Sequence, residues 1–290
     1  MALAMSYTLG VLGGSGLYEM EGLSGVTEVD VDTPFGRPSD VLVKGTLDDG
    51  TTLLFLPRHG RGHRVPPHAI NYRANVCALK KAGATHLVSV SAVGSMKEEI
   101  APGHLVVPDQ FIDLTKRRVT TYFEDGVAAH VPFADPTCAL LAGALAAAAD
   151  RAGARVHRGG TYVCMEGPQF STRAESRVYR TWGVSVIGMT SMPEAKLARE
   201  AELPFATLAL ATDYDCWHDG HDAVTVDQVV ATMKQNVSFA KRALVELSGR
   251  LPDPTKSVAH RALKGAVMTS PGAVTPDARA RLAWLLDLPR

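Results

Sequence analysis

The sequence predicts a single α/β domain in which helices flank a central mixed β-sheet, and two patterns support this prediction. Short, continuously apolar segments typical of buried strands recur along the chain, and the clearest runs from Phe205 to Ala211. Segments with helical periodicity lie between several of them, for example at residues 71–82. This alternation favours a sheet covered on both faces. A chain of 290 residues with 46% hydrophobic content can bury a core of that size.

The other expected elements follow from the same two patterns. Strand signals recur within residues 7–16, 51–60, 85–95, 103–112, 160–168 and 184–191. Helical patterns lie at residues 71–82, 135–152, 172–182, 195–200 and 225–248. Pro136 would occupy the first position of the second helix, and Thr225 with Gln228 would form a capping box at the start of the last.

The chain is expected to divide into a main domain and a C-terminal extension. Residues 7–250 contain nearly all the strand and helix signals and are predicted to form one domain. Residues 251–290 are rich in proline and show little periodicity until residues 275–286, which predict a short amphipathic helix. We expect this extension to pack on a neighbouring copy of the chain.

Composition and charge exclude several classes of partner. Thirty basic and 30 acidic residues balance, so no overall field draws the protein to nucleic acid or to a membrane surface. No apolar run approaches the roughly 20 residues that span a bilayer, and the N-terminus lacks the pattern of a signal peptide. The four cysteines have no paired short spacing, which fits reduced thiols. We therefore expect a cytoplasmic protein without nucleic-acid or membrane partners.

Two segments that follow predicted strands offer groups that bind anions. Residues 13–16 read GGSG, in which backbone amides and the Ser15 hydroxyl could hold a phosphate. No P-loop lysine follows, and Glu19 stands where the dinucleotide fingerprint has its third glycine, so an ordinary tight turn is the alternative. Residues 58–64 read RHGRGHR. Arg58 could bind phosphate oxygens and His59 could add a donor, although a solvated basic loop is the alternative.

Hydroxyl side chains stand where two other strands are expected to end. Ser91 and Ser95 belong to one of these strand ends, and Thr190 and Ser191 belong to the other. Each hydroxyl alone is more typical of a turn or a helix cap. Together with the Gly-rich turn and the basic loop, they predict a buried pocket for an oxyanion.

Asp213 and Asp215 follow the apolar strand that begins at Phe205. Both carboxylates would point the same way if the extended geometry persists to residue 215, at a sheet edge where ligands collect. Solvated turn residues are the alternative. Residues 215–222, DCWHDGHD, also contain potential zinc or manganese ligands. Their spacing matches no metal signature, so a metal-dependent hydrolase is a rival hypothesis rather than the preferred one.

Phe170 and Ser171 are adjacent in a segment that leads into a predicted helix. An aromatic face beside a hydroxyl suits a site in which a purine stacks. An ordinary core phenylalanine is the alternative.

These motifs resemble the trimeric purine nucleoside phosphorylases, in particular their branch that cleaves 5′-methylthioadenosine. The matching blocks keep a consistent order over about residues 8–240 and do not include the C-terminal extension. They are GVLGGSGL, VDTPFGRPSD, PRHGRGH, NYRAN, SAVGS, PGHLVVPDQFIDLT, EGPQFSTRAE, VIGMTSMPEAKLARE and ATDYDCW. The resemblance implies a phosphorylase-type central mixed β-sheet flanked by helices, and a homotrimer with active sites near the subunit boundaries. The helix in residues 251–290 is then expected to pack on the same trimer.

The resemblance, matched position by position, assigns roles to the candidate residues. The phosphate-binding positions are Ser15, Arg58, His59, Ser91, Ala92 and Thr190, with serine at 15 and 91 where relatives often have threonine. The nucleoside-binding positions are Phe170 and Ser171 for the base, Met189 for the ribose, and Val226, Val229 and His63 for the 5′ substituent. His130 matches a histidine that the neighbouring subunit lends to the 5′ pocket. Asp213 and Asp215 match the acidic edge of the base pocket and are the expected catalytic residues.

The resemblance implies a pentosyltransferase of methionine and purine salvage that converts 5′-methylthioadenosine and phosphate into adenine and 5-methylthioribose 1-phosphate. Inorganic phosphate is the co-substrate, and no cofactor and no metal are expected. Asp213 favours a 6-aminopurine, because a carboxyl group can accept from the amine whereas an amide suits a 6-oxopurine better. Phosphorolysis of inosine, guanosine or methylthioinosine is the alternative, and a dinucleotide-binding oxidoreductase is more remote.

Overall fold

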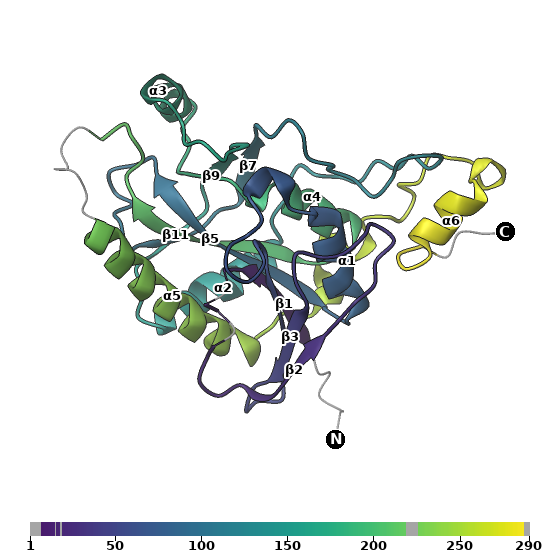
Figure 1. Cartoon of the computed structure of the whole chain (residues 1–290), viewed down its shortest axis with the longest axis horizontal. Coiled ribbons are helices and arrows are strands. Elements are labelled where there is room, and N and C mark those ends of the chain that lie inside the picture. The colour runs from purple at the N-terminus through teal and green to yellow at the C-terminus, as the bar shows by residue number, and fades with distance from the viewer. Residues whose placement is uncertain (1–6, 15, 18, 219–225, 287–290) are drawn as a thin grey trace.

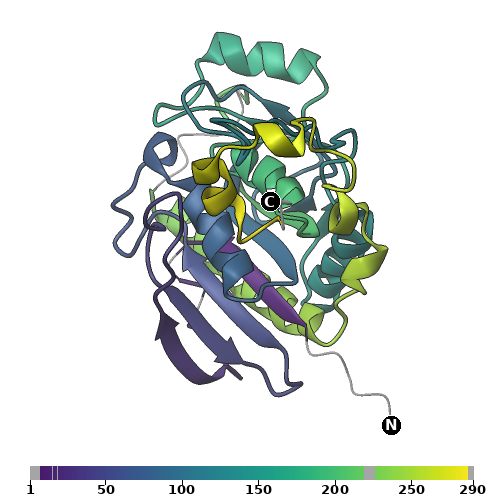
Figure 2. The same ribbon diagram turned by 90° about the vertical axis from the view of Figure 1, so that its right-hand side faces the viewer.

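The computed structural model describes residues 7–14, 16, 17, 19–218 and 226–286, with all their side chains except those of residues 226–230. These residues form a mixed sheet with helices on both of its faces (Figures 1 and 2). The predicted α/β class and the single flanked sheet are therefore confirmed.

The long strand β5 (His86–Ser95) lies at the centre of the sheet. Its first half pairs in parallel with β1 (Thr8–Gly13), and β11 (Phe205–Asp213) pairs in parallel with it over most of its length. Its last residues also pair antiparallel with β10 (Val186–Gly188). Nearly every residue of β5 and β11 is buried, as expected for strands covered on both faces.

The remaining strands extend the sheet in three directions. They are β4 (Thr52–Pro57), β3 (Leu42–Thr46) and β2 (Ser24–Val29) beyond β1, β9 (Thr161–Cys164) and β7 (Gln110–Asp113) beyond β10, and β6 (Leu105–Val107) and β8 (Val156–Arg158) beyond β11. Strands β4, β1, β5 and β11 run parallel. The segments that follow β1, β4 and β11 therefore lie at one edge of the sheet.

Helices cover the two faces in pairs. α1 (Tyr72–Lys81) and α4 (Ser191–Glu200) pack on one face and share its hydrophobic cluster. α2 (Ala139–Arg151) and α5 (Val226–Ser248) pack on the other face, where they lie side by side (Figure 1). Each pair thus closes one layer of the core over the buried strands.

α3 (Arg173–Thr181) stands away from the body of the molecule (Figures 1 and 2). Within it, only Ser176 and Tyr179 are buried. Its start is fixed by a capping box, in which the Thr172 hydroxyl accepts from the Glu175 N–H while the Glu175 carboxylate accepts from the Thr172 N–H. The helix therefore has a defined beginning although it buries little surface.

The sequence pattern does not predict β2, β3 and β8. β2 is an edge strand in which nearly every residue is exposed, so it has no apolar alternation to detect. The segment 103–112, expected as one strand, forms β6 and β7 with Pro108 and Asp109 between them. Proline lacks the N–H that a continuous ladder needs.

α2 begins at Ala139 and not at Pro136, so the predicted start is wrong. The Cys138 N–H donates to the carbonyl of Phe205 on β11 at 2.8 Å, and Cys138 has an extended backbone. Because this bond ties the chain to the sheet at residue 138, the helix starts one residue later. The capping box expected at Thr225 lies outside the described residues.

The C-terminal residues 251–286 pack on the body of their own chain. α6 (Pro276–Leu282) buries Leu282 in the hydrophobic cluster beneath α1. The Trp284 ring lies 5.0 Å from the Tyr122 ring and 6.2 Å from the Phe35 ring, measured between centroids. The division at residue 250 and the packing of this extension on another copy stay predictions.

All four cysteines are free thiols, and three of them are buried. No helix in the described part of the chain has both the length and the apolar character needed to cross a membrane.

Candidate active site

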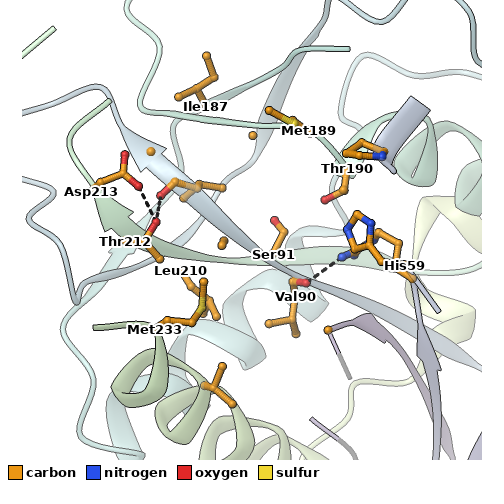
Figure 3. A pocket seen from close by; sticks show the side chains of 18 of the residues that line it. His59, Val90, Ser91, Ile187, Met189, Thr190, Leu210, Thr212, Asp213 and Met233 are labelled. Atoms are coloured by element: carbon orange, nitrogen blue, oxygen red, sulfur yellow. Dashed lines mark hydrogen bonds between the residues drawn. The ribbon is translucent and has the colours of Figure 1, made fainter. Parts of the chain in front are cut away.

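A pocket of about 590 Å³ lies at the sheet edge where β1, β4 and β11 end. It brings together many of the residues predicted from the sequence, namely Arg58, His59, His63, Ser91, Ala92, Phe170, Met189, Thr190, Asp213 and Asp215. Its polar groups gather at two ends, one near Ser91 and Thr190 and one near Asp213 (Figure 3). Residues far apart in the sequence meet here because the parallel strands all end at this edge.

The hydroxyls of Ser91 and Thr190 form the first polar end of the pocket. Their residues are only 7% and 6% exposed, and neither oxygen has a hydrogen-bond partner among the described residues. A buried polar group left unpaired costs roughly 1–3 kcal/mol. Two such hydroxyls lining one pocket therefore mark the place of a ligand that accepts hydrogen bonds, and an oxyanion has the oxygens to do so.

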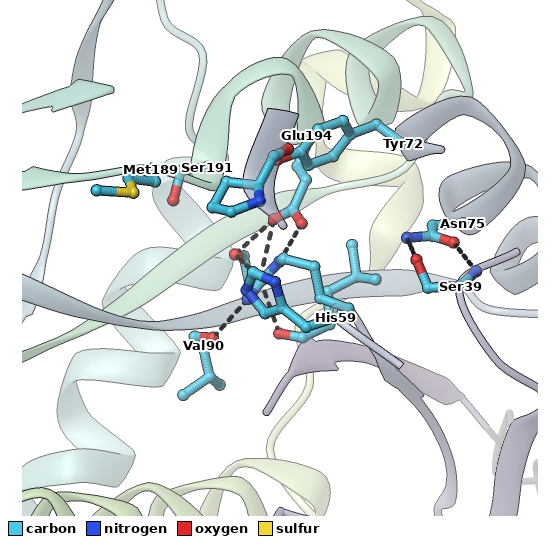
Figure 4. Close-up of polar contacts among 12 residues, drawn as sticks. Ser39, His59, Tyr72, Asn75, Val90, Met189, Ser191 and Glu194 are labelled. Atoms are coloured by element: carbon cyan, nitrogen blue, oxygen red, sulfur yellow. Dashed lines mark hydrogen bonds and ion pairs between the residues drawn. The ribbon is translucent and has the colours of Figure 1, made fainter. Parts of the chain in front are cut away.

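Arg58 follows β4 directly and is buried beneath this end of the pocket. Its Nε and Nη2 groups donate to the Glu194 carboxylate (Figure 4). Nη2 also donates to Ser89 Oγ at 2.8 Å and to the Leu12 carbonyl at 3.1 Å. Nη1 donates to the Val90 carbonyl at 3.1 Å, which leaves one Nη1–H without a partner among the described residues. A ligand in the pocket can accept that remaining hydrogen.

His59 lies beside Arg58 with its ring stacked on His63, the two centroids 4.2 Å apart. Its Nδ1 lies 2.8 Å from the Val65 carbonyl, so Nδ1 carries the proton and donates. Burial lowers the pKa of His59 to about 4, because the Val65 hydrogen bond opposes it only in part and the Arg58 charge adds to it. His59 is therefore neutral near pH 7. Its Nε2 can accept a hydrogen bond in this state, and the donor role predicted for His59 stays a prediction.

Asp213 and Asp215 form the second polar end and differ in their surroundings. Asp215 accepts hydrogen bonds from Ser171 Oγ at 3.1 and 3.2 Å and from Ser176 Oγ of α3. Asp213 accepts from Thr212 Oγ1 at 2.7 Å (Figure 3). Burial raises the pKa of Asp213, Thr212 opposes this in part, and the charge of Asp215 adds to the rise. This raised pKa suits Asp213 to the role of proton donor.

The backbone between the two acids is not the continuous strand that the sequence suggested. β11 has a register irregularity between Ala211 and Asp213 and ends at Asp213, and a turn follows. Both acids nevertheless lie beside Gly94 of β5. A Cβ atom at Gly94 would lie 3.1 Å from Asp213 Oδ1 and 3.3 Å from the Asp215 Cβ. The small residue at 94 is what allows both side chains to approach this strand.

Ser91 is not at a strand end, as the sequence suggested, but within β5, which continues to Ser95. The hydroxyl lies beside the pocket because β1 pairs with β5 only up to Ser89, and β10 joins β5 only at Gly94. Ser91 therefore stands where β5 has β11 as its neighbour on one side and no strand on the other.

Met189 lies between the two polar ends of the pocket, and Phe170 lies on its rim. Met189 follows β10 and lines the pocket (Figure 3). Phe170 also lines it, although 83% of the residue is exposed. Ser171 reaches the site through its hydrogen bonds to Asp215. The aromatic ring thus stands at the mouth of the pocket rather than in the core.

Several predicted residues are not brought together by the described structure. His130 is exposed and is not among the pocket-lining residues. Ser15 and the side chains of Val226 and Val229 lie outside the described residues. The role of each of them stays a prediction.

The structure adds an apolar wall that the sequence reasoning missed. Met233 and Val237 of α5 line the pocket together with Leu210 of β11 and Leu17 (Figure 3 shows Met233 and Leu210). Met233 and Val237 are four residues apart, so the helical spacing of apolar residues beyond Val229 could have identified them. Arg118 and Glu194, which hold the pocket from behind, carried no local signal.

The rival metal hypothesis is not tested by the described structure, because several of its candidate ligands lie outside the described residues. Within residues 7–218 and 226–286, apart from residues 15 and 18, no group of three or more His, Cys, Asp or Glu side chains could hold a metal ion. His218 lies 3.2 Å from a Glu98 carboxylate oxygen, and Asp219, His221 and Asp222 lie outside the described residues.

Comparisons with known proteins point to one family. The chain matches the phosphorylase superfamily over residues 8–248. It is 57% identical over 283 residues to the S-methyl-5′-thioadenosine phosphorylase of Geobacter sulfurreducens, covering 97% of this chain and 99% of that protein. A methylthioadenosine phosphorylase from an antarctic soil metagenomic library has a similar crystal structure, with a TM-score of 0.91, 48% identity, and coverage of 97% and 99%. The methylthioadenosine phosphorylase of Schistosoma mansoni in complex with adenine gives a TM-score of 0.82, 36% identity, and coverage of 90% and 99%.

The causes of the raised pKa of Asp213 can be tested by titration. Asp215→Asn is expected to lower the pKa of Asp213, because it removes a neighbouring negative charge. Thr212→Val is expected to raise it, because the Asp213 carboxylate loses a hydrogen bond. Carbon-13 NMR of the aspartate carboxyl groups measures both shifts, with Asp253→Asn in the C-terminal extension as the control. An Asp213 signal that moves in neither variant contradicts this account.

Proposed function

The chain belongs to the phosphorylase superfamily, and on this basis we propose that it cleaves 5′-methylthioadenosine with inorganic phosphate, giving adenine and 5-methylthioribose 1-phosphate. The family resemblance seen in the sequence motifs is confirmed. We infer the substrate from the relatives. They are methylthioadenosine phosphorylases, and this chain matches them over nearly their full length. The geometry of the pocket supports this reaction independently of the comparison with relatives.

The observation that carries the proposal is one pocket with two chemically different ends. Ser91 and Thr190 offer unpaired hydroxyls at one end, and Arg58 adds one N–H. Asp213 lies at the other end with a raised pKa. The first end can hold an oxyanion that attacks, and the second can give a proton to a leaving group. This arrangement fits a displacement at an atom between the two ends.

The chemical step forms one bond and breaks one. A phosphate oxygen attacks the anomeric carbon C1′ as the C1′–N9 bond breaks, and the electron pair of that bond goes to the purine. The negative charge of the phosphate also stabilises the cationic character that the sugar develops. Asp213 gives its proton to N7, so that neutral adenine leaves, and it then regains a proton from water. Asp215, fixed by Ser171 and Ser176, orients the base.

The carboxyl group at 213 also selects the purine. The 6-amino group of adenine donates a hydrogen bond that a carboxyl oxygen can accept. The 6-oxo group of other purines is an acceptor, which the NH2 group of an amide would bind better. The apolar wall of Leu210, Met233 and Val237 suits a methylthio group, because a hydroxyl there would lose its water without gaining a partner. An apolar pocket rejects an added hydroxyl only about a hundredfold, so this preference is moderate.

Asp213→Asn is expected to lower turnover of 5′-methylthioadenosine about 10²- to 10⁴-fold, the usual contribution of a general acid. Product formation is measured on 5′-methylthioadenosine, adenosine and inosine, each with and without phosphate, with Asp253→Asn as the control. Adenine release by the wild-type protein without phosphate indicates a hydrolase instead. Unchanged turnover in Asp213→Asn removes the assigned role.

Ser91→Ala and Thr190→Val are each expected to raise the phosphate KM about tenfold or more, because a hydrogen bond to a charged group contributes about 1.5–3 kcal/mol. The KM for the nucleoside should change much less. Thr137→Val is the matched control, since Thr137 is also buried but its hydroxyl donates to the Pro108 carbonyl at 3.1 Å. Equal losses for phosphate and nucleoside would show that the hydroxyls do not form an anion site.

The proposal includes a homotrimer in which His130 of one copy completes the pocket of the next. His130 is exposed on its own chain, and Phe170 leaves most of its ring at the mouth of the pocket uncovered. A second copy that covers this rim would shield both residues from water.

Sedimentation is expected to give three times the chain mass, and His130→Ala is expected to raise the KM for 5′-methylthioadenosine about tenfold, as loss of a desolvated contact of roughly 1.4 kcal/mol would. The phosphate KM serves as the internal control and should stay unchanged. A fully active monomer would rule out the shared pocket.

A further inference from the structure

The Arg118 side chain lies in the interior behind the pocket and is only 1% exposed. Its guanidinium makes a hydrogen bond with every donor it has. Nε donates to Glu166 Oε1 at 2.8 Å, and Nη2 donates to the Glu166 carbonyl at 2.7 Å and to the Met165 carbonyl at 3.4 Å. Nη1 donates to the carbonyls of Met189 and Met192 at 2.7 and 2.6 Å and to the Tyr72 hydroxyl at 2.8 Å. A single side chain therefore joins three separate segments of the chain.

Two of these segments line the pocket with a residue at or next to the acceptor, and the third is connected to the pocket through Pro67. Met189 lines it directly, and Thr190 follows. Met165, beside Glu166, lines it from the segment that continues to Phe170. The Tyr72 hydroxyl, which accepts from Arg118, donates in turn to the carbonyl of Pro67 at 2.9 Å, and Pro67 also lines the pocket.

Glu166 is held from a second direction as well. Its Oε2 accepts from the backbone N–H groups of Lys116 and Arg117, at 2.5 and 2.9 Å. Residues 116–118 thus surround this carboxylate with three donors. Burial alone would raise the pKa of Glu166, but these hydrogen bonds outweigh it and hold the pKa below its ordinary value.

The two segments that Arg118 joins pack closely against each other. Gly167 has a φ of +69°, and a Cβ atom there would lie 2.6 Å from Met189 Sδ. The segment that carries Phe170 and Ser171 therefore packs directly on the side chain predicted to lie under the ribose. A shift of either backbone by 1 Å would move the sugar contact relative to the base contact.

We propose that Arg118 is a positioning residue, which holds the Met189 segment and the Phe170–Ser171 segment at the spacing that the bound nucleoside needs. This inference rests on the proposed function, since it concerns the same pocket. Arginine suits the task because its planar fork presents five donors in fixed directions. Lysine keeps the charge but has three donors on one atom, so it cannot reach acceptors spread around a plane.

The test compares Arg118→Lys with Arg199→Lys. Arg199 is a matched control, because it is also buried and donates to two backbone carbonyls, those of Pro132 and Asp135, but neither of these acceptor residues lines the pocket. Arg118→Lys is expected to lower kcat/KM for 5′-methylthioadenosine about a hundredfold, the cost of a displacement of about 1 Å. Arg199→Lys should change it less than threefold, while thermal unfolding shows how far each variant is destabilised.

Rescue separates positioning from general damage. Guanidinium ion at millimolar concentration is expected to restore activity to Arg118→Ala in a saturable way, and to have no such effect on Arg199→Ala.

Glu166→Gln is a milder variant that can be used if the arginine variants do not fold, because it keeps an acceptor for Nε. Its kcat/KM is expected to fall about tenfold. Equal kinetic losses in the 118 and 199 variants, or an unaffected Glu166→Gln, would overturn the inference. A wild-type protein inactive on 5′-methylthioadenosine would instead overturn the proposed function.

Discussion

The buried ion pair between Arg58 and Glu194 is the interaction on which the arrangement of the pocket depends. Arg58 follows β4, Glu194 belongs to α4, and the guanidinium also binds the Leu12 and Val90 carbonyls of β1 and β5. Neither charge has access to water, so neither is tolerable without the other, and loss of one partner from such a pair typically costs about 3–5 kcal/mol. Three parallel strands and the helix above them are thereby fixed in relation to one another before any ligand binds.

This pairing decides how an anion can be recognised. Glu194 largely balances the charge of Arg58, and His59 is neutral near pH 7 because burial lowers its pKa to about 4. An anion therefore meets hydrogen-bond donors more than net positive charge, which agrees with the balanced composition of the chain. The hydroxyls of Ser91 and Thr190 suit this task, because they are buried and lose no other partner when a ligand arrives.

The sequence predicted what depends on local pattern. Buried strands such as β11, and the chemistry that follows β4 and β11, could be identified because parallel strands place their ends together. β2 escaped detection since an exposed edge strand needs no apolar alternation. The start of α2 depends on a bond from Cys138 to Phe205, 67 residues away, and the partners of Arg58 and Arg118 are equally remote in the chain. Such contacts exist only once the fold has formed, so no local window contains them.

Two buried arginines thus serve the pocket in opposite ways. Arg58 is neutralised by a carboxylate and keeps one N–H for the cavity, whereas Arg118 has committed every donor to the surrounding protein. At the base end of the pocket, the raised pKa of Asp213 favours the protonated carboxyl group that can deliver a proton. Burial is the main cause of that raised pKa, and the charge of Asp215, whose carboxylate Ser171 and Ser176 bind, adds to it. Because Ser171 belongs to the segment that Arg118 anchors through Glu166, a side chain outside the pocket lining helps to hold the Asp215 charge beside Asp213.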